Sequence, residues 1–164
     1  MKRTAVLVCA LIFFSAMTGA QVSIQNQETK QVQQSIYGLG FSAGFASGFG
    51  LSFRHHPPGL FSYQIIGGIV KVDRNTDYNI GGELQFDIMR GDRVRFFADG
   101  ATGYFYSGDD GKNNLAGPYR VGLGFGWEWL HFDPMNFTGE ILFTYFSDGT
   151  VLPLPQLSAH YYFF

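Results

Sequence analysis

The stretch Asn79-Ile80-Gly81-Gly82-Glu83-Leu84-Gln85-Phe86-Asp87-Ile88 decides the fold of this chain. Its even-numbered positions are apolar or glycine, and its odd-numbered positions are polar or glycine. Successive side chains of a β-strand point to opposite faces of the sheet, so this alternation predicts a strand with one apolar and one polar face. A tilted strand needs about 9–11 residues to cross a membrane, and this stretch is long enough to do so.

The same alternation recurs on both sides of this stretch and predicts eight strands in all. The other seven are expected at 35–45, 49–54, 61–71, 93–106, 119–129, 137–145 and 157–163. Short turns are expected at 46–48, 55–59, 91–92 and 131–136, and longer or more polar loops at 72–77, 108–118 and 148–155. The predicted fold class is therefore all-β, an eight-stranded antiparallel up-and-down transmembrane β-barrel.

The polar face of these strands separates two kinds of barrel. A soluble, lipocalin-like periplasmic carrier places apolar side chains inside and charged ones in water, whereas a membrane barrel inverts that arrangement. On the first, second and sixth predicted strands the polar face is mostly glycine and serine. Such a face suits the narrow interior of an eight-stranded barrel better than it suits a solvent surface. Aromatic residues near strand ends, such as Tyr37 and Trp129, are typical of a membrane–water boundary. The membrane barrel is favoured, and the soluble carrier stays as an alternative.

Charged residues on the polar face are expected to meet inside the barrel, because an isolated ion in a dry interior is strongly unfavourable. The predicted lumenal charge network consists of Glu83, Asp87, Arg93, Arg95, Asp99, Arg120, Glu128 and Glu140. Its three arginines face five acids, so two carboxylates are left in excess. Water, His160 or protonation would have to balance them.

The N-terminus has the features of a secretory signal peptide. Lys2 and Arg3 precede an apolar run over 5–14, and small residues before Gln21 indicate cleavage after Ala20. The apolar run is shorter than the ~20 residues of a membrane-spanning helix. The predicted domains are a signal peptide at 1–20, a flexible glutamine-rich lead-in at 21–34 and the barrel at 35–164.

Composition excludes several classes of function. Cys9 is the single cysteine and lies inside the signal peptide, so the secreted chain has neither disulfides nor thiolate metal sites. Val8, directly before Cys9, argues against a lipoprotein cleavage site. The net charge is −2 and falls to −4 once Lys2 and Arg3 are removed, which argues against a nucleic-acid partner. We expect no cofactor and no metal.

Residues 35–164 resemble, in pattern, the small outer-membrane barrel proteins of Gram-negative bacteria, the class that includes OmpA and OmpX. The resemblance implies an outer-membrane location, contact with outer-membrane lipid and lipopolysaccharide, and a monomer with a structural or surface-interaction role. The C-terminus is also similar to the assembly signal of this class, polar-x-Gly-x-x-aromatic-x-aromatic. The matching positions are Gln156, Ser158, Tyr161 and Phe163, with serine in place of glycine and one extra residue, Phe164. This similarity implies recognition by the barrel-assembly machinery.

One segment raises the question of catalysis. Tyr145-Phe146-Ser147-Asp148-Gly149 resembles the region around the active serine of PagL-type lipid A deacylases, in which that family reads His-x-Ser-Asn. Carried over, Ser147 would be the nucleophile, but Tyr145 stands at the position of the base and Ala159 near that of the acid. A serine without a base is a weak nucleophile. The sequence therefore predicts a non-enzymatic barrel, with a deacylase-like hydrolase as the alternative.

Overall fold

The computed structural model describes residues 34–109, 112–130 and 134–163. The predicted signal peptide, the cleavage site at Ala20 and Gln21, and nearly all of the predicted lead-in lie outside these residues. Among the described residues, no helix is long and apolar enough to cross a membrane.

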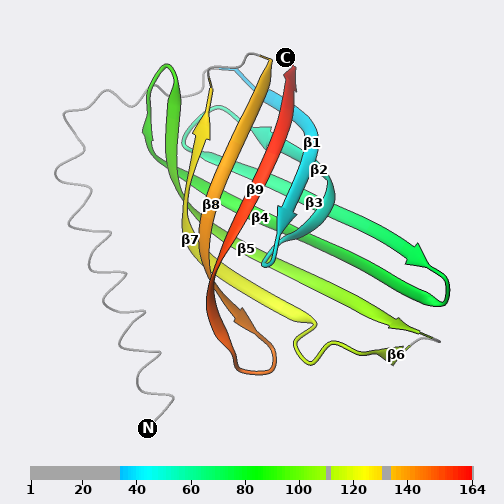
Figure 1. The fold of residues 1–164 in the computed structure, drawn as a ribbon. Coiled ribbons are helices and arrows are strands. Elements are labelled where there is room, and N and C mark those ends of the chain that lie inside the picture. Colours follow the sequence, from blue (N-terminus) through cyan, green and yellow to red (C-terminus); the bar gives the residue numbers. More distant parts are fainter. Residues whose placement is uncertain (1–33, 110–111, 131–133, 164) are drawn as a thin grey trace, which may run out of the picture.

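Eight antiparallel strands form a closed barrel, which confirms the predicted fold class (Figure 1). The strands are β1 (Ile36–Gly44), β2 (Gly48–His56), β3 (Phe61–Val72), β4 (Asn75–Arg90), β5 (Val94–Asp109), β7 (Tyr119–Trp129), β8 (Met135–Phe146) and β9 (Val151–Phe163). Each pairs with the next along the chain, and β9 pairs back with β1 from Tyr37↔Phe163 to Gly44↔Gln156. A two-residue strand, β6 (Lys112–Asn113), pairs only with the end of β5. Closure leaves the backbone groups of the ring paired within the chain, which a structure in hydrocarbon requires.

The strands differ greatly in length. β4 and β5 have 16 residues each, whereas β1 and β2 have 9 each. Figure 1 shows the far ends of β4 and β5 extending well beyond the turn that joins β1 to β2. The barrel is therefore tall on one side and short on the other at the end opposite the start of β1 and the end of β9.

Three of the predicted loops are corrected by the structure. Residues 72–77 are mostly strand, because β3 continues to Val72 and β4 begins at Asn75. Only residues 73 and 74 form the turn between them. Residues 148–155 are mostly strand, since β9 begins at Val151. Within 108–118, β5 continues to Asp109 and β6 follows at Lys112.

The two prolines in β9 explain why that strand was mistaken for a loop. Pro153 and Pro155 stand opposite Phe143 and Ile141 of β8, but pairing with β1 begins only at Gln156. A proline lacks the N–H that a ladder needs and is tolerated where one edge of a strand is free. The first part of β9 has such a free edge, so the strand accommodates both prolines.

Side chains alternate between an apolar outer surface and a largely polar interior. Phe41, Leu51 and Leu84 are 67%, 68% and 67% exposed on the outside, and most other outward side chains are also large and apolar. The buried polar side chains include Arg54, Gln64, Glu83, Gln85, Asp87, Arg95, Asp99, Glu128, Glu140, Gln156 and His160. The structure thus has its apolar side chains outside and its charges inside.

The barrel interior as candidate functional site

The centre of the interior is a carboxylate held between two arginines. Arg54 of β2 and Arg95 of β5 are both fully buried, and Glu128 of β7 lies between them. Arg54 Nη1 lies 3.2 Å from Glu128 Oε1, and Arg95 Nη1 lies 2.8 Å from Glu128 Oε2. This one carboxylate therefore offsets part of the positive charge of both arginines, because each of its oxygens binds a different guanidinium.

The remaining guanidinium donors are also hydrogen-bonded. Arg54 donates from Nε to Gln64 at 2.7 Å and from its terminal nitrogens to Thr138 at 2.8 Å and Ser158 at 3.1 Å. Arg95 donates from Nε to Asp87 at 2.5 Å and from Nη2 to Ser62 at 2.7 Å. A buried charge is tolerated when its partners replace the lost water, and both arginines meet that condition.

Glu83 of β4 and Glu140 of β8 form a second cluster, in which two glutamines bridge the carboxylates. Gln85 Nε2 donates to Glu83 at 3.3 Å and to Glu140 at 3.2 Å. Gln156 Nε2 donates to Glu140 at 2.5 Å and also to Glu83. Both amides are oriented by donors on their oxygens, since Arg95 donates to Gln85 Oε1 at 3.1 Å and Ser47 donates to Gln156 Oε1 at 2.7 Å.

Asp99 of β5 differs from the other buried carboxylates of this interior. The residue is 5% exposed, and both of its carboxylate oxygens are buried without a hydrogen-bond partner among the described residues. Most buried polar atoms in proteins are hydrogen-bonded, so this carboxylate stands out from the groups around it.

At the end of the barrel where β1 begins and β9 ends, aromatic and imidazole groups continue the network. His56 Nε2 lies 2.8 Å from Tyr162 Oη, and that hydroxyl also donates to Glu128. Asp87 binds Arg90 at 2.8 Å as well as Arg95. The interior is thus filled by a continuous set of hydrogen-bonded side chains from β2, β3, β4, β5, β7, β8 and β9.

Six of the eight residues predicted for the lumenal charge network lie in this interior, namely Glu83, Asp87, Arg95, Asp99, Glu128 and Glu140. The prediction was wrong for Arg93, which is exposed in the turn before β5. Arg120 is only half-buried, and its Nη1 donates to the carbonyl oxygen of Phe45 at 2.9 Å rather than to an acid.

Arg54 was missed, although the alternation of Ser52, Arg54 and His56 in β2 places all three on the polar face. This alternation is the feature of the sequence that indicates an inward position for Arg54. With Arg54 in place of Arg93, the buried acids still outnumber the buried arginines.

The residues singled out for assembly and catalysis occupy different surroundings. Gln156 and Ser158 are buried and point inward, whereas Tyr161 and Phe163 are exposed on the outer surface. The role of these four residues in assembly stays a prediction.

Ser147 lies in the exposed turn between β8 and β9, and its Oγ accepts a hydrogen bond from the Tyr119 N–H at 3.3 Å. In the same turn, the backbone N–H of Thr150 donates to Asp148 and lowers the pKa of that carboxyl. Within the described part of the chain, no group of three or more His, Cys, Asp or Glu side chains could hold a metal ion.

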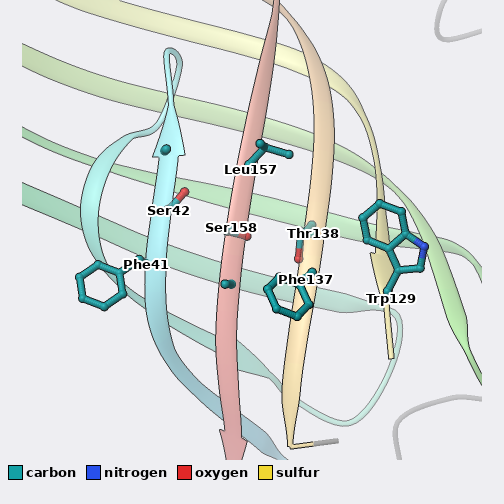
Figure 2. Close-up of a pocket in the computed structure, with 9 residues that line it drawn as sticks. Phe41, Ser42, Trp129, Phe137, Thr138, Leu157 and Ser158 are labelled. Atoms are coloured by element: carbon teal, nitrogen blue, oxygen red, sulfur yellow. The ribbon is translucent and has the colours of Figure 1, made fainter. Parts of the chain in front are cut away.

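A groove on the outer surface crosses three neighbouring strands, β1, β9 and β8. Figure 2 shows Phe41, Leu157 and Phe137 on these strands, with Trp129 of β7 beyond them. Ala43 and Ala159 contribute small side chains between the larger ones. The groove is therefore apolar and opens away from the polar interior.

Solved structures share this fold, although the chain matches no protein-family profile and no curated protein by sequence. The N-terminal β-barrel domain of OprF from Pseudomonas aeruginosa is 10% identical, with a TM-score of 0.52 over 82% of this chain and 100% of that one. The outer membrane protein Ail of Yersinia pestis, in a phospholipid bilayer nanodisc, is 13% identical, with a TM-score of 0.45 over 79% of this chain and 99% of that one. Neisserial surface protein A is 15% identical, with a TM-score of 0.40 over 79% and 93%. The similarity to the OprF domain shows that the chain has the fold of the small eight-stranded barrels.

Proposed function

We propose that this chain is an integral outer-membrane β-barrel protein with a structural or surface-interaction role. In this proposal the interior is a packed polar core and not an open passage. The observation that carries the proposal is the inversion of burial, with large apolar side chains outside and charged side chains inside. In water, an outer surface of this kind would be strongly unfavourable, whereas in a bilayer it replaces lipid–lipid contacts with lipid–protein contacts.

The fold of the OprF barrel domain and the predicted signal peptide support the same location. The groove over β1, β9 and β8 also fits hydrocarbon, because its large lining side chains, Phe41, Trp129, Phe137 and Leu157, are apolar. A lipocalin-like carrier requires apolar side chains around its cavity and a charged exterior, and the described residues have the opposite arrangement. The proposed partners are outer-membrane lipid and lipopolysaccharide around a monomer, and the barrel-assembly machinery during insertion.

The proposal includes no catalytic role. The hydroxyl of Ser147 accepts a backbone hydrogen bond, and the positions that would supply a base and an acid are occupied by Tyr145 and Ala159. Tyrosine is a less usual base for a serine than histidine, and alanine has no ionisable group.

Fractionation and gel mobility test the proposal together. The full chain is expressed in a Gram-negative host, and membranes are separated from the periplasmic extract without detergent. We expect the protein in the outer-membrane fraction, with different mobilities before and after boiling in sodium dodecyl sulfate. A protein found in the aqueous extract, with one mobility under both conditions, would show that the location is wrong.

A further inference from the structure

The turn that joins β1 to β2 is buried, although connections between strands normally lie on the protein surface. Ala46 is 1% exposed and Ser47 is not exposed at all. In contrast, residues 147–150 in the turn between β8 and β9 are all exposed. The β1–β2 turn is therefore folded inward.

This turn reaches the opposite wall of the barrel. In the ring β1-β2-β3-β4-β5-β7-β8-β9, β5 is opposite β1 and β7 is opposite β2. A Cβ added to Gly103 of β5 would lie 2.5 Å from the carbonyl oxygen of Ala46, and one added to Gly122 of β7 would lie 3.0 Å from Ala46 Cβ. Because real Cβ atoms do not approach backbone so closely, these glycines leave the space that the turn occupies.

Two side chains hold the turn in this position. Asn79 of β4 accepts a hydrogen bond from the Phe49 N–H at 2.9 Å and donates one to the Phe49 carbonyl at 2.9 Å. Arg120 of β7 donates to the Phe45 carbonyl at 2.9 Å, and its guanidinium carbon lies 3.7 Å from the ring centre of Phe105. The guanidinium is thus fixed by an aromatic ring on one side and by the turn on the other.

The turn also closes the space above the acidic cluster. Ala46 packs with Ala101 and Leu142 in a small apolar cluster. Directly beneath, Ser47 donates to Gln156, the amide that bridges Glu83 and Glu140. Moving the turn outward would remove both the apolar cover and one of the donors that orient this amide.

We propose that the β1–β2 turn is a plug in the mouth of the barrel opposite the start of β1 and the end of β9, and that Arg120 is the latch that keeps it closed. The inference rests on the proposed function, because it assigns to one turn the closure of the packed interior. Release of Arg120 lets the turn swing outward and admits water to Glu83 and Glu140.

The first test is a disulfide between the plug and the far wall. The predicted mature chain contains no cysteine, so Ala46→Cys with Gly122→Cys introduces a single pair. We expect this pair to cross-link in the folded, heat-modifiable protein, because the two Cβ positions are close enough to need only a small shift. The control pair Ala46→Cys with Gly149→Cys should stay reduced, since nothing lies within 4 Å of a Cβ at Gly149. Failure of the pair Ala46→Cys with Gly122→Cys to cross-link would overturn the plug, provided that the gel shift shows a folded barrel.

The second test measures protection of Ala46→Cys from a water-soluble maleimide in liposomes. The plug predicts slow labelling in the otherwise unchanged chain and labelling at least about tenfold faster when Arg120→Ala removes a charged hydrogen bond. Gly103→Ala should have a similar effect, because its Cβ would displace the Ala46 carbonyl, whereas Gly100→Ala should not, because its Cβ meets only Leu123 at 3.3 Å.

Rapid labelling of the Ala46→Cys chain with Arg120 intact would overturn the plug, and equal rates with and without Arg120 would overturn the latch. Both readouts are taken only from the folded fraction. The gel shift of the same sample separates failure of the plug from failure of the membrane assignment.

Discussion

At the scale of single residues, the buried charged side chains of the interior share partners more than they form separate one-to-one ion pairs. Glu128 binds Arg54 and Arg95 at once, and its oxygens also receive the Tyr162 hydroxyl. Removing this carboxylate takes an ion-pair partner from both arginines at once. Among the described residues, Arg95 would keep Asp87, and Arg54 would keep only Glu140, at 3.9 Å.

Glu128→Gln should therefore destabilise the barrel strongly. Breaking a buried ion pair by removing one partner costs about 3–5 kcal/mol, and the amide supplies no charge to either guanidinium. The measurement is the urea unfolding midpoint of the protein refolded into detergent micelles or liposomes. Arg93→Gln is the matched control, because Arg93 is exposed in a turn and its replacement should leave the midpoint unchanged. Equal midpoints for both variants would contradict the central position of Glu128.

Residue identity alone could not predict the whole interior. Alternation correctly placed Glu83, Arg95 and Glu128 inside, because the side-chain period of a strand is fixed. The same alternation puts Phe97 and Leu142 on the inner face, where they are 0% and 1% exposed, but their apolar character alone predicts the opposite face.

At the scale of elements, the strands were more predictable than their connections. Each predicted strand corresponds to an observed one, but residues 72–77 and most of 148–155 are not the loops that were predicted. At 72–77 the polar composition reflects exposure at the far end of a long strand, and at 148–155 the two prolines resemble those of a loop. The burial of the β1–β2 turn was equally hard to predict, because the turn fits inside the barrel only where glycines in β4, β5 and β7 leave space for it.

The turn between β3 and β4 gives a test of this tight connection. Asp73 has a φ of 53°, a left-handed conformation that aspartate tolerates and a β-branched residue does not. Asp73→Val should lower the free energy of unfolding by about 1 kcal/mol, whereas Asp73→Gly should not lower it. Denaturant unfolding of both variants makes the comparison. If valine and glycine had the same effect, residues 72–77 would be a flexible loop, as polarity alone indicated.

At the scale of the whole molecule, the closed ring of strands both pairs the backbone and separates polar from apolar side chains. Closure pairs the backbone of β1 with that of β9, and the period of two sends charges inward and apolar groups outward. The taller side of the barrel, formed by β4 and β5, extends beyond the plugged mouth (Figure 1). Membrane contact is therefore expected for the middle of each strand and not for the ends of the long hairpin.

A charge placed on the outer surface should distinguish these two regions. Leu84→Arg puts a guanidinium in the middle of β4, where the cost in a bilayer is about 2–4 kcal/mol. Val72→Arg is the matched control, because Val72 is the last residue of β3, at the tip of the long hairpin. We expect Leu84→Arg to reduce folding yield into liposomes and Val72→Arg to leave it nearly unchanged. A similar yield for both variants would mean that the middle of β4 is not in contact with lipid.

Quenching of a probe in the middle of β4, compared with one at the tip of the β3–β4 hairpin, tests the central claim most directly. A small environment-sensitive fluorophore is attached to Leu84→Cys or Val72→Cys in the predicted mature chain, which lacks Cys9, and the folded protein is placed in liposomes. Brominated lipid chains should quench the probe at position 84 strongly and iodide in the water hardly at all, with the reverse at position 72. Strong quenching of position 84 by aqueous iodide, with no effect of brominated lipid, would contradict an apolar outer surface that faces the membrane.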